Sequence, residues 1–389
     1  MAADAGVLIL GGGCAGLSLG VRLAERPAAL GRTVILESRE GYDNDRTWCF
    51  WRHGPHRFEH LVARSWRTLS LSAPGREVTV DCDATPYQMV EAAAFYSGAQ
   101  AAIAGSPAVE LRLGTAVLGV PRRVAEGWRV ETAAGPVTAA CVVDTRPAGR
   151  TRSDDALLWQ SFFGQDITCD APVFDPGVAG LMHFDAGRTG DVMFRYVLPF
   201  SPHRALVETT VFGPRRLGEA DLAAAQAAAV EELCGGGPAR IGRSERGVLP
   251  MGLARRPAAP SPGLCQAGLT SGAARASTGY AFQRIQRWAD AAAATLAQGG
   301  MPAGHLPDPV LQRGMDGLFL RVLRREPARA PDLFLRMFGA HPAGVIRFLS
   351  DCGTPADCAR IGLALPLPLF LGELARTLAG RPAAPRAAS

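Results

Sequence analysis

Residues 7–16 read Val-Leu-Ile-Leu-Gly-Gly-Gly-Cys-Ala-Gly, and the expected fold class follows from them. The apolar run 7–10 predicts a buried strand, and the glycines after it open a helix that continues towards Glu25. Residues 33–36, Thr-Val-Ile-Leu, predict a second buried strand. A strand, a glycine turn, a helix and a strand in this order form a βαβ unit, which predicts an α/β fold.

The glycine turn has the spacing of a dinucleotide-binding site, G-x-G-x-x-G. The first glycine permits the turn, the second lets the backbone approach a pyrophosphate, and the third lets helix and strand pack closely. Glu37, at the end of the second strand, is expected to accept hydrogen bonds from an unphosphorylated ribose, as in FAD or NAD. The cofactor-binding residues predicted here are Gly11, Gly13, Cys14, Ala15, Gly16 and Glu37.

A later segment favours FAD over NAD. Residues 264–268 are followed by Ser-Thr-Gly-Tyr at 277–280 and then by an amphipathic helix. In flavoproteins a second helix N-terminus lies under the flavin ring, where its partial positive charge stabilises the reduced anion. Tyr280 either caps the flavin or anchors a turn, and Arg46 either borders the flavin or pairs with Asp43 or Asp45. This segment and its surroundings add Gly268, Thr278, Gly279, Tyr280 and Arg46 to the predicted cofactor-binding residues.

Length and composition predict a folded protein of two lobes. Of the 389 residues, 48% are apolar and 20% charged, which leaves ample material for a core and no compositional case for disorder. The net charge is +5, and no run of like charges or aromatic-plus-basic motif indicates a nucleic acid partner. His53, His56 and His60 lie in one loop without a ligating thiolate or carboxylate pattern, so a surface role is favoured over a metal site.

The cysteine pattern and the N-terminus predict a cytoplasmic protein. Nine cysteines are scattered singly without a C-x-x-C motif, as expected in a reducing compartment. The chain has no signal-type stretch before its first strand and no run of about 18 apolar residues, so we expect neither secretion nor a membrane span. Residues 363–371 are almost wholly apolar and form either a core cap or a surface for peripheral membrane contact.

Changes in residue pattern predict how the lobes are divided. Residues 87–101 predict a helix, and aromatic strands at 192–198 and 205–212 predict a hairpin with its turn at 199–204. The pattern after Pro309 is helical. The predicted ranges are 1–80 and 81–150 for the first two parts of an FAD-binding domain, 151–250 for a mainly β substrate domain, 251–300 for the last part of the FAD-binding domain, and 301–389 for a C-terminal helical cap.

Two further segments are distinctive. Residues 44–51 read Asn-Asp-Arg-Thr-Trp-Cys-Phe-Trp, and residues 206–210, within the longer run 198–210, read Leu-Val-Glu-Thr-Thr. Together with the glycine turn and with residues 276–282, Ala-Ser-Thr-Gly-Tyr-Ala-Phe, they make the chain resemble the lycopene cyclases along almost its full length. The glycine turn is shared with many flavoproteins, whereas the two distinctive segments look like this family specifically.

The resemblance implies a Rossmann-like FAD-binding domain of the glutathione-reductase and hydroxylase flavoprotein type, with an interleaved β-sheet substrate domain and a C-terminal helical cap. It implies FAD that acts in its reduced form, NAD(P)H as reductant, and lycopene from the membrane as substrate, converted to a β-ring carotenoid without net electron transfer. No obligate protein partner is indicated. The family's essential acid falls on Glu208. His183 stands where related sequences often carry Asp, and Glu91 where a basic residue is frequent; both bear on substrate or product more than on fold.

The chemistry of ring closure fits Glu208. A terminal double bond takes a proton, a neighbouring alkene attacks the carbocation, and a ring proton is lost, so the site needs an acid, negative charge and no water. On a strand Glu208 shares a face with Leu206, Thr210 and Phe212, which raises the pKa of its carboxyl. We hypothesise that Glu208 and the flavin share the proton transfer and the stabilisation of the cation. The alternative is that Glu208 is a solvent-facing glutamate at a strand edge. The predicted substrate contacts are Trp48, Trp51 and Phe212, with core packing as the alternative for the tryptophans.

Two other classes of function remain as alternatives. The same fold serves FAD-dependent monooxygenases and prenyl-chain reductases, which consume NAD(P)H in proportion to product. A non-catalytic flavin- or carotenoid-binding protein is the second alternative. The sequence does not decide whether one or both ends are cyclised or which ring isomer forms. It also does not decide whether the substrate is lycopene or a modified linear carotenoid.

Overall fold

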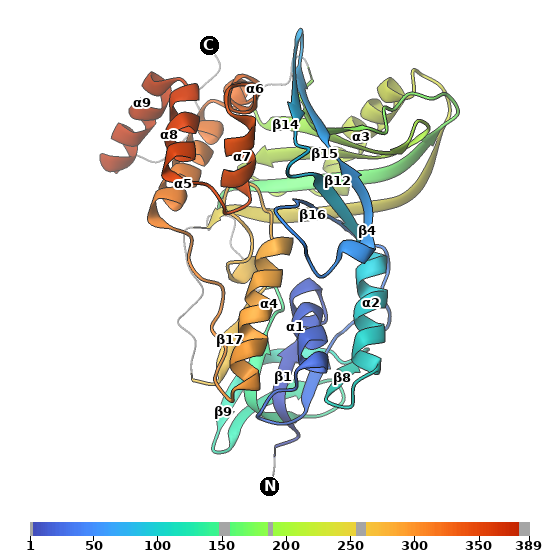
Figure 1. Ribbon diagram of the computed structural model, residues 1–389, viewed down its shortest axis with the longest axis vertical. Helices are drawn as coiled ribbons and strands as arrows, with labels where there is room; N and C mark the ends of the chain where they lie inside the picture. The colour runs from blue at the N-terminus through green and yellow to red at the C-terminus, as the bar shows by residue number, and fades with distance from the viewer. Residues whose placement is uncertain (1–2, 148–155, 186–189, 254–261, 381–389) are drawn as a thin grey trace.

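A largely parallel sheet organises the lobe at the bottom of Figure 1. The computed structural model describes residues 3–147, 156–185, 190–253 and 262–380. The strands of this sheet follow the order β8-β2-β1-β11-β10-β9, with β17 beside β11. They are β1 (Ala5–Leu10), β2 (Thr33–Leu36), β8 (Val109–Arg112), β9 (Val117–Val124), β10 (Gly127–Thr132), β11 (Val137–Asp144) and β17 (Leu264–Gln266). The predicted βαβ unit and the α/β fold are confirmed.

Three helices cover this sheet on the side of the glycine turn. They are α1 (Cys14–Glu25), α2 (Ala92–Ala104) and α4 (Phe282–Ala297), and α1 contacts both of the others. Their apolar faces share one core with β1 and β11. β17 and α4 come from far along the chain, so this lobe is assembled from separate stretches of sequence.

A second sheet, which also has seven strands in the described residues, lies above the first lobe in Figure 1. Its order is β16-β12-β15-β14-β13-β5-β6. Its strands are β5 (Thr68–Ala73), β6 (Arg76–Asp81), β12 (Ala156–Cys169), β13 (Val178–His183), β14 (Val192–Ser201), β15 (Arg204–Gly213) and β16 (Ala239–Leu253). The predicted hairpin is confirmed as β14 and β15, with a tighter turn than expected because β14 continues to Ser201.

The five predicted domain ranges remain predictions. β5 and most of β6 fall within residues 1–80, yet they pair in the second sheet rather than in the first. The predicted boundary between residues 150 and 151 lies outside the described residues.

The helix predicted at residues 87–101 is wrong in its first five residues. Tyr87–Glu91 is the strand β7, the centre of a three-stranded sheet with β3 (Thr47–Trp51) and β4 (Val62–Trp66). Pairing with two strands satisfies the backbone groups of β7 on both sides, and this tertiary contact overrides the local helical pattern. The helix α2 begins only after Glu91.

The two faces of the second sheet pack against different helices. On β15 the side chains of Ala205 and Val207 pack towards α3 (Glu219–Leu233), whereas Leu206 and Phe212 belong to the core shared with the C-terminal helices. This alternation follows from the two-residue period of a strand. The even-numbered residues of β15, Glu208 among them, therefore face the interior between the sheet and the rest of the molecule.

The C-terminal region is helical, as predicted. Its helices are α5 (Val310–Arg325), α6 (Ala330–Ala340), α7 (Pro342–Leu349), α8 (Pro355–Ala364) and α9 (Leu367–Leu378). Thr354 caps α8 through its side chain, which accepts a hydrogen bond from Asp357 N. Among the described helices none is by itself long and apolar enough to cross a bilayer; α8 and α9, which meet at 108°, reach the required length and composition only as a pair.

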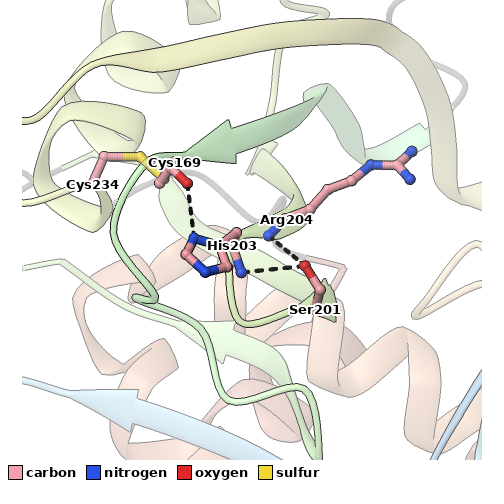
Figure 2. The surroundings of a disulfide bond; sticks show 5 residues. All are labelled: Cys169, Ser201, His203, Arg204 and Cys234. Carbon is pink, nitrogen blue, oxygen red and sulfur yellow. Dashed lines mark hydrogen bonds between the residues drawn. A yellow bond between two sulfur atoms is a disulfide. The ribbon is translucent and has the colours of Figure 1, made fainter.

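One pair of cysteines is bonded, although the scattered cysteines predict a reducing compartment. Cys169, at the end of β12, forms a disulfide with Cys234, directly after α3 (Figure 2). The turn between β14 and β15 lies beside this bond: His203 N donates to Ser201 Oγ, and the ring Nδ1 of His203 is 3.2 Å from the carbonyl oxygen of Cys169. The two cysteines are 65 residues apart in sequence, so only the packing of α3 on the sheet brings them together.

Candidate functional site

The glycine turn joins β1 to α1 with the geometry that the motif predicts. Gly11 has φ +94°, a conformation that favours glycine. A Cβ atom on Gly16 would lie 2.0 Å from the carbonyl oxygen of Gly11, so this position also requires glycine. A Cβ on Gly13 would meet nothing within 4 Å, which leaves the backbone at the N-terminus of α1 open to an approaching ligand. The turn therefore fits a pyrophosphate group.

Glu37 lies at the end of β2 against this turn. Gly12 N donates a 2.7 Å hydrogen bond to Glu37 Oε2, and Arg39 forms an ion pair with the same carboxylate. Burial by itself would raise the pKa of Glu37, but the hydrogen bonds from Arg39 and Gly12 lower it overall. An ionised carboxylate that already accepts hydrogen bonds fits the predicted acceptor for ribose hydroxyls.

The later segment packs against the first turn of α1. Gly268 has φ +94°, and a Cβ there would lie 3.0 Å from the carbonyl oxygen of Thr145 and 3.7 Å from Cβ of Ala15. The close approach of two backbones thus requires glycine at position 268. Two predicted cofactor-binding segments that are far apart in sequence are brought together here.

Cys14 and Arg46 lie near one another at the same end of α1. Burial raises the pKa of the Cys14 thiol to about 12, and the charge of Arg46 acts in the opposite direction. Arg46 also pairs with Asp45 at 2.6 Å, one of the two pairings that the sequence left open. Cofactor contact by either residue remains a prediction.

Residues 278–280 lie at the contact between the two lobes. Gly279 has φ +72°, and a Cβ there would lie 2.9 Å from Cδ1 of Leu249 in the second sheet. The hydroxyl of Tyr280 is 3.2 Å from that of Tyr87 in β7. Thr278 and Tyr280 also line a cavity, described next, so these residues lie where a cofactor in the first lobe and a ligand in the second would meet.

An apolar cavity of about 280 Å³ lies between the second sheet and the C-terminal helices. Its wall contains two of the three predicted substrate residues, Trp51 and Phe212, together with Tyr196 and Tyr280. The helices contribute aromatic and aliphatic side chains such as Phe319, Phe334, Phe370, Leu367, Leu371 and Leu374. Polar groups are few along this wall, so the cavity suits a hydrocarbon.

Trp48, the third predicted substrate residue, does not line this cavity. Its ring stacks on Phe282 at 5.4 Å and meets the edges of Phe95 and Tyr96 in the core of the first lobe. This is the aromatic cluster that the sequence offered as the alternative for the tryptophans. A substrate contact by Trp48 remains a prediction without geometric support.

Glu208 lies beside the cavity wall. It pairs directly with Tyr196 across β14 and β15 and shares its strand face with Phe212, and both of these residues line the cavity. Thr210 Oγ1 donates a 2.9 Å hydrogen bond to Glu208 Oε1. The side chain is partly buried, which argues against the alternative of a glutamate in open solvent.

The surroundings of Glu208 favour its protonated form. Burial raises the pKa of Glu208 well above its ordinary value, and the charge of Glu245 and a hydrogen bond with Glu245 raise it further. The hydrogen bond from Thr210 and the charge of Arg243 oppose this shift without cancelling it. A neutral carboxyl next to an apolar cavity is the arrangement that an acid catalyst for an alkene requires.

Sequence reasoning missed two groups of residues at this site. Glu245 on β16 contacts Glu208, but the polar sequence of β16 has no apolar alternation that would reveal its face or register. Arg275 is almost fully buried and pairs with Asp316 of α5 at 3.1 Å, which anchors the loop before Tyr280 to the C-terminal helices. The sequence offers one signal for the role of Arg275, which is an arginine in a loop otherwise rich in glycine and alanine.

The loop histidines and His183 lie away from Glu208, whereas Glu91 lies close to the residues around it. Within the described ranges no three His, Cys, Asp or Glu side chains are grouped to hold a metal ion, and the ring Nε2 of His56 is 2.8 Å from Gln88 Oε1. His183 lies near Ser72, with Nδ1 2.8 Å from its hydroxyl, in a separate polar cavity. Glu91 Oε1 is 3.9 Å from Arg243 Nη2, so this position does border the Glu245 group.

Comparison with known sequences identifies the family. The family model described as lycopene cyclase protein matches residues 6–371. The chain belongs to the lycopene cyclase family. A lycopene beta-cyclase from Paracoccus sp. (strain N81106 / MBIC 01143) is 30% identical to this lycopene cyclase family member over 397 residues, covering 97% of each chain.

Solved structures with the same architecture are flavoproteins and their relatives. A geranylgeranyl bacteriochlorophyll reductase-like protein from Thermoplasma acidophilum is similar with a TM-score of 0.62 and 13% identity, over 95% of this chain and 98% of that one. Aklavinone-11 hydroxylase, in complex with FAD and aklavinone, has a TM-score of 0.56 and 14% identity, over 89% of this chain and 71% of the hydroxylase. At these identities the likeness shows the fold, so the predicted Rossmann-like flavoprotein fold of this lycopene cyclase family member is confirmed.

Proposed function

We propose that this protein is a carotenoid cyclase that closes β-rings at the ends of lycopene or a related linear carotenoid. The observation that carries the proposal is the apolar cavity whose wall includes Tyr196, the cross-strand neighbour of the partly buried Glu208, and Phe212, which lies on the same strand face as Glu208. Membership of the lycopene cyclase family and the Paracoccus relative support the same reaction. A largely apolar cavity with a carboxyl group beside its wall suits protonation of a hydrocarbon better than chemistry on a polar substrate.

FAD is the proposed cofactor, because the residues present fit a dinucleotide. The open backbone at Gly13 would receive the pyrophosphate, Glu37 the ribose, and the loop around Gly268 and Tyr280 the flavin end. When bound and reduced, with NAD(P)H as the proposed reductant, FAD supplies an electron-rich ring that stabilises nearby positive charge.

The chain's own residues account for the remaining steps. Glu208 donates its proton to the terminal double bond, and the faces of Trp51, Phe212 and Tyr280 stabilise the resulting cation. A second double bond supplies the electron pair of the new carbon–carbon bond. Loss of a ring proton to the Glu208 carboxylate restores the acid, so neither protons nor electrons are consumed overall.

We further propose that the substrate enters from the cytoplasmic surface of a membrane. The cavity volume lies near the lower end of the range for ligand pockets, about 300–1,000 Å³, so it would take one end of a long chain. Leu367, Leu371 and Leu374 line the cavity and are also exposed, and Leu363 and Leu378 extend the exposed apolar surface of α8 and α9. An apolar opening of this kind suits contact with a bilayer in which the polyene is dissolved.

Expression in a lycopene-accumulating host tests the proposed reaction. We expect pigments with the mass of lycopene but altered chromatographic retention, together with linear lycopene in the Glu208→Gln variant. Added oxygen would instead indicate a monooxygenase, added hydrogen a reductase, and unchanged lycopene a binding protein. Each of these three results would contradict the proposal, provided that the purified wild-type protein carries FAD.

A further inference from the structure

Glu245, Gly164, Glu208 and Tyr196 form one row across four adjacent strands. Gly164 of β12 pairs with Glu245 of β16 on one side and with Glu208 of β15 on the other, and Glu208 pairs with Tyr196 of β14. Residues opposite each other in a sheet project from the same face. All three side chains of the row therefore lie on the face that borders the cavity.

The glycine in the middle of the row lets the two carboxyl groups meet. A Cβ atom at position 164 would lie 3.1 Å from Cβ and 3.2 Å from Cγ of Glu208, and 3.3 Å from Cγ of Glu245. These distances are closer than ordinary van der Waals contact, so a larger residue would push the two glutamates apart. With glycine there, the side chains of Glu208 and Glu245 both approach this position and come close to one another.

Glu245 is held in place by contacts that do not involve Glu208. Arg243 Nη1 forms a 2.6 Å ion pair with Glu245 Oε2, and Thr47 Oγ1 of β3 donates a 2.7 Å hydrogen bond to the same oxygen. Arg243 Nη2 in turn donates to Thr47 Oγ1 at 2.5 Å. Glu245 is almost fully buried, so its negative charge is fixed at one point beside Glu208.

Two carboxyl groups in contact inside a protein do not both ionise without a large cost, so one of them keeps a proton. The guanidinium of Arg243 lies against Glu245, which makes Glu245 the charged partner. The other titratable or charged groups that act on Glu208 or lie next to it are Arg243 on β16, Tyr196 on β14, Tyr280 before α4, and Cys49 on β3. Glu245 is the acidic group that acts on Glu208, and the side chains of both residues approach position 164.

We propose that Glu245 is a positioning residue for ring closure: its carboxylate, fixed by Arg243 and Thr47, holds the proton on Glu208 between turnovers, and Gly164 permits this contact. The inference rests on the proposed function. When Glu208 gives its proton to the double bond, two negative charges face each other, and the proton released from the ring returns to Glu208 and relieves this repulsion. The pair thus favours both the presence of the acid before reaction and its recovery afterwards.

Infrared spectroscopy of the purified protein tests the contact without substrate. The band of the protonated Glu208 carboxyl is assigned by its loss in Glu208→Gln, and its titration is followed as the pH rises. Glu245→Gln keeps the shape but removes the charge, so we expect the midpoint to fall by about one pH unit or more. Gly164→Ala should also lower the midpoint, although Glu245 is still present. The midpoint of Glu245→Asp should lie between those of Glu245→Gln and the wild type.

The pH dependence of turnover provides the second measurement. The alkaline limb of kcat should move to lower pH by the same amount in Glu245→Gln, whereas the exposed Glu219→Gln control on α3 should leave it unchanged. If Glu245 only ties β16 to β3, its variants will unfold at lower temperature without moving either midpoint, which would overturn the proposal. A wild-type enzyme that fails to cyclise lycopene would overturn the proposed function and with it this role, whatever the infrared result.

Discussion

At the residue scale, the position of Glu208 supports its proposed role as the acid that protonates a hydrocarbon. Its strand places it on the interior face beside the cavity wall that Tyr196 and Phe212 line, and Glu245 adds a negative charge. Each of these contacts penalises the ionised form. The same features that favour proton donation make an ionised residue 208 costly to the folded protein.

Replacing Glu208 with Gln should therefore abolish turnover and stabilise the fold. Loss of a general acid typically costs roughly 10²–10⁴-fold in rate. Because the pKa of Glu208 is raised in the folded state, the wild type loses stability as pH rises above the ordinary value of about 4.3, up to its raised value. The Gln variant lacks this loss, so the difference in Tm should grow with pH in calorimetry. Equal differences at all pH values, as expected for Glu219→Gln, would contradict the raised pKa.

At the scale of elements, contacts between distant segments decide local structure that the sequence pattern does not predict. β7 has helix-compatible residues and adjoins a true helix, yet four of its five residues, Tyr87, Gln88, Met89 and Val90, are buried between two partner strands. The Cys169–Cys234 disulfide similarly joins two elements, β12 and α3, that are separate in sequence. α3 covers the side of the sheet opposite to Glu208, so this bond stabilises the β14–β15 hairpin on that opposite face.

Opening the disulfide should lower the Tm without removing the cavity. A cross-link over such a loop typically contributes about 2–4 kcal/mol to stability. We expect a lower Tm for Cys169→Ser with Cys234→Ser and for the reduced wild type, and no change for the control Cys352→Ser, which removes a free exposed thiol. Alkylation of the denatured, unreduced protein should label the seven free cysteines of the described region. Labelling of all nine cysteines would show that the bond does not form.

At the scale of the whole molecule, α8 and α9, which carry exposed leucines, lie far from the β9 end of the first lobe (Figure 1). A bilayer could therefore contact α8 and α9 without touching the glycine turn. Under the proposed function, this separation would let a hydrocarbon substrate and a polar dinucleotide approach from different sides.

Acidic substitutions on that surface should weaken membrane binding alone. Leu363 and Leu378 are 73% and 80% exposed, so Leu363→Glu with Leu378→Glu should leave folding intact. Burying one leucine contributes about 1.5–3 kcal/mol, so partition into phosphatidylcholine–phosphatidylglycerol vesicles should fall at least about tenfold in sedimentation. Activity on detergent-dispersed substrate should persist. Leu118→Glu with Val120→Glu, on β9, is the matched control; an equal loss there would refute a specific docking surface.

Much of the fold was predictable because its signals are local. The strand, glycine turn and helix of the βαβ unit follow from neighbouring residues, since the required turn at Gly11 and the close packing at Gly16 are made within one short segment. The face on which Glu208 lies follows equally from the two-residue period of β15.

Only the tertiary structure placed Glu245 against Glu208, because their contact depends on the register of β16 and β15 on either side of β12. The same holds for the separation of Trp48 from Trp51: two rings of one strand enter different cores, and nothing in their spacing decides which core borders the cavity. The sequence by itself thus determined the kind of fold, the dinucleotide motif and one acid. Assembly of distant strands and helices determined the cavity, its opening and the partner of that acid, since register and packing are properties of the folded chain as a whole.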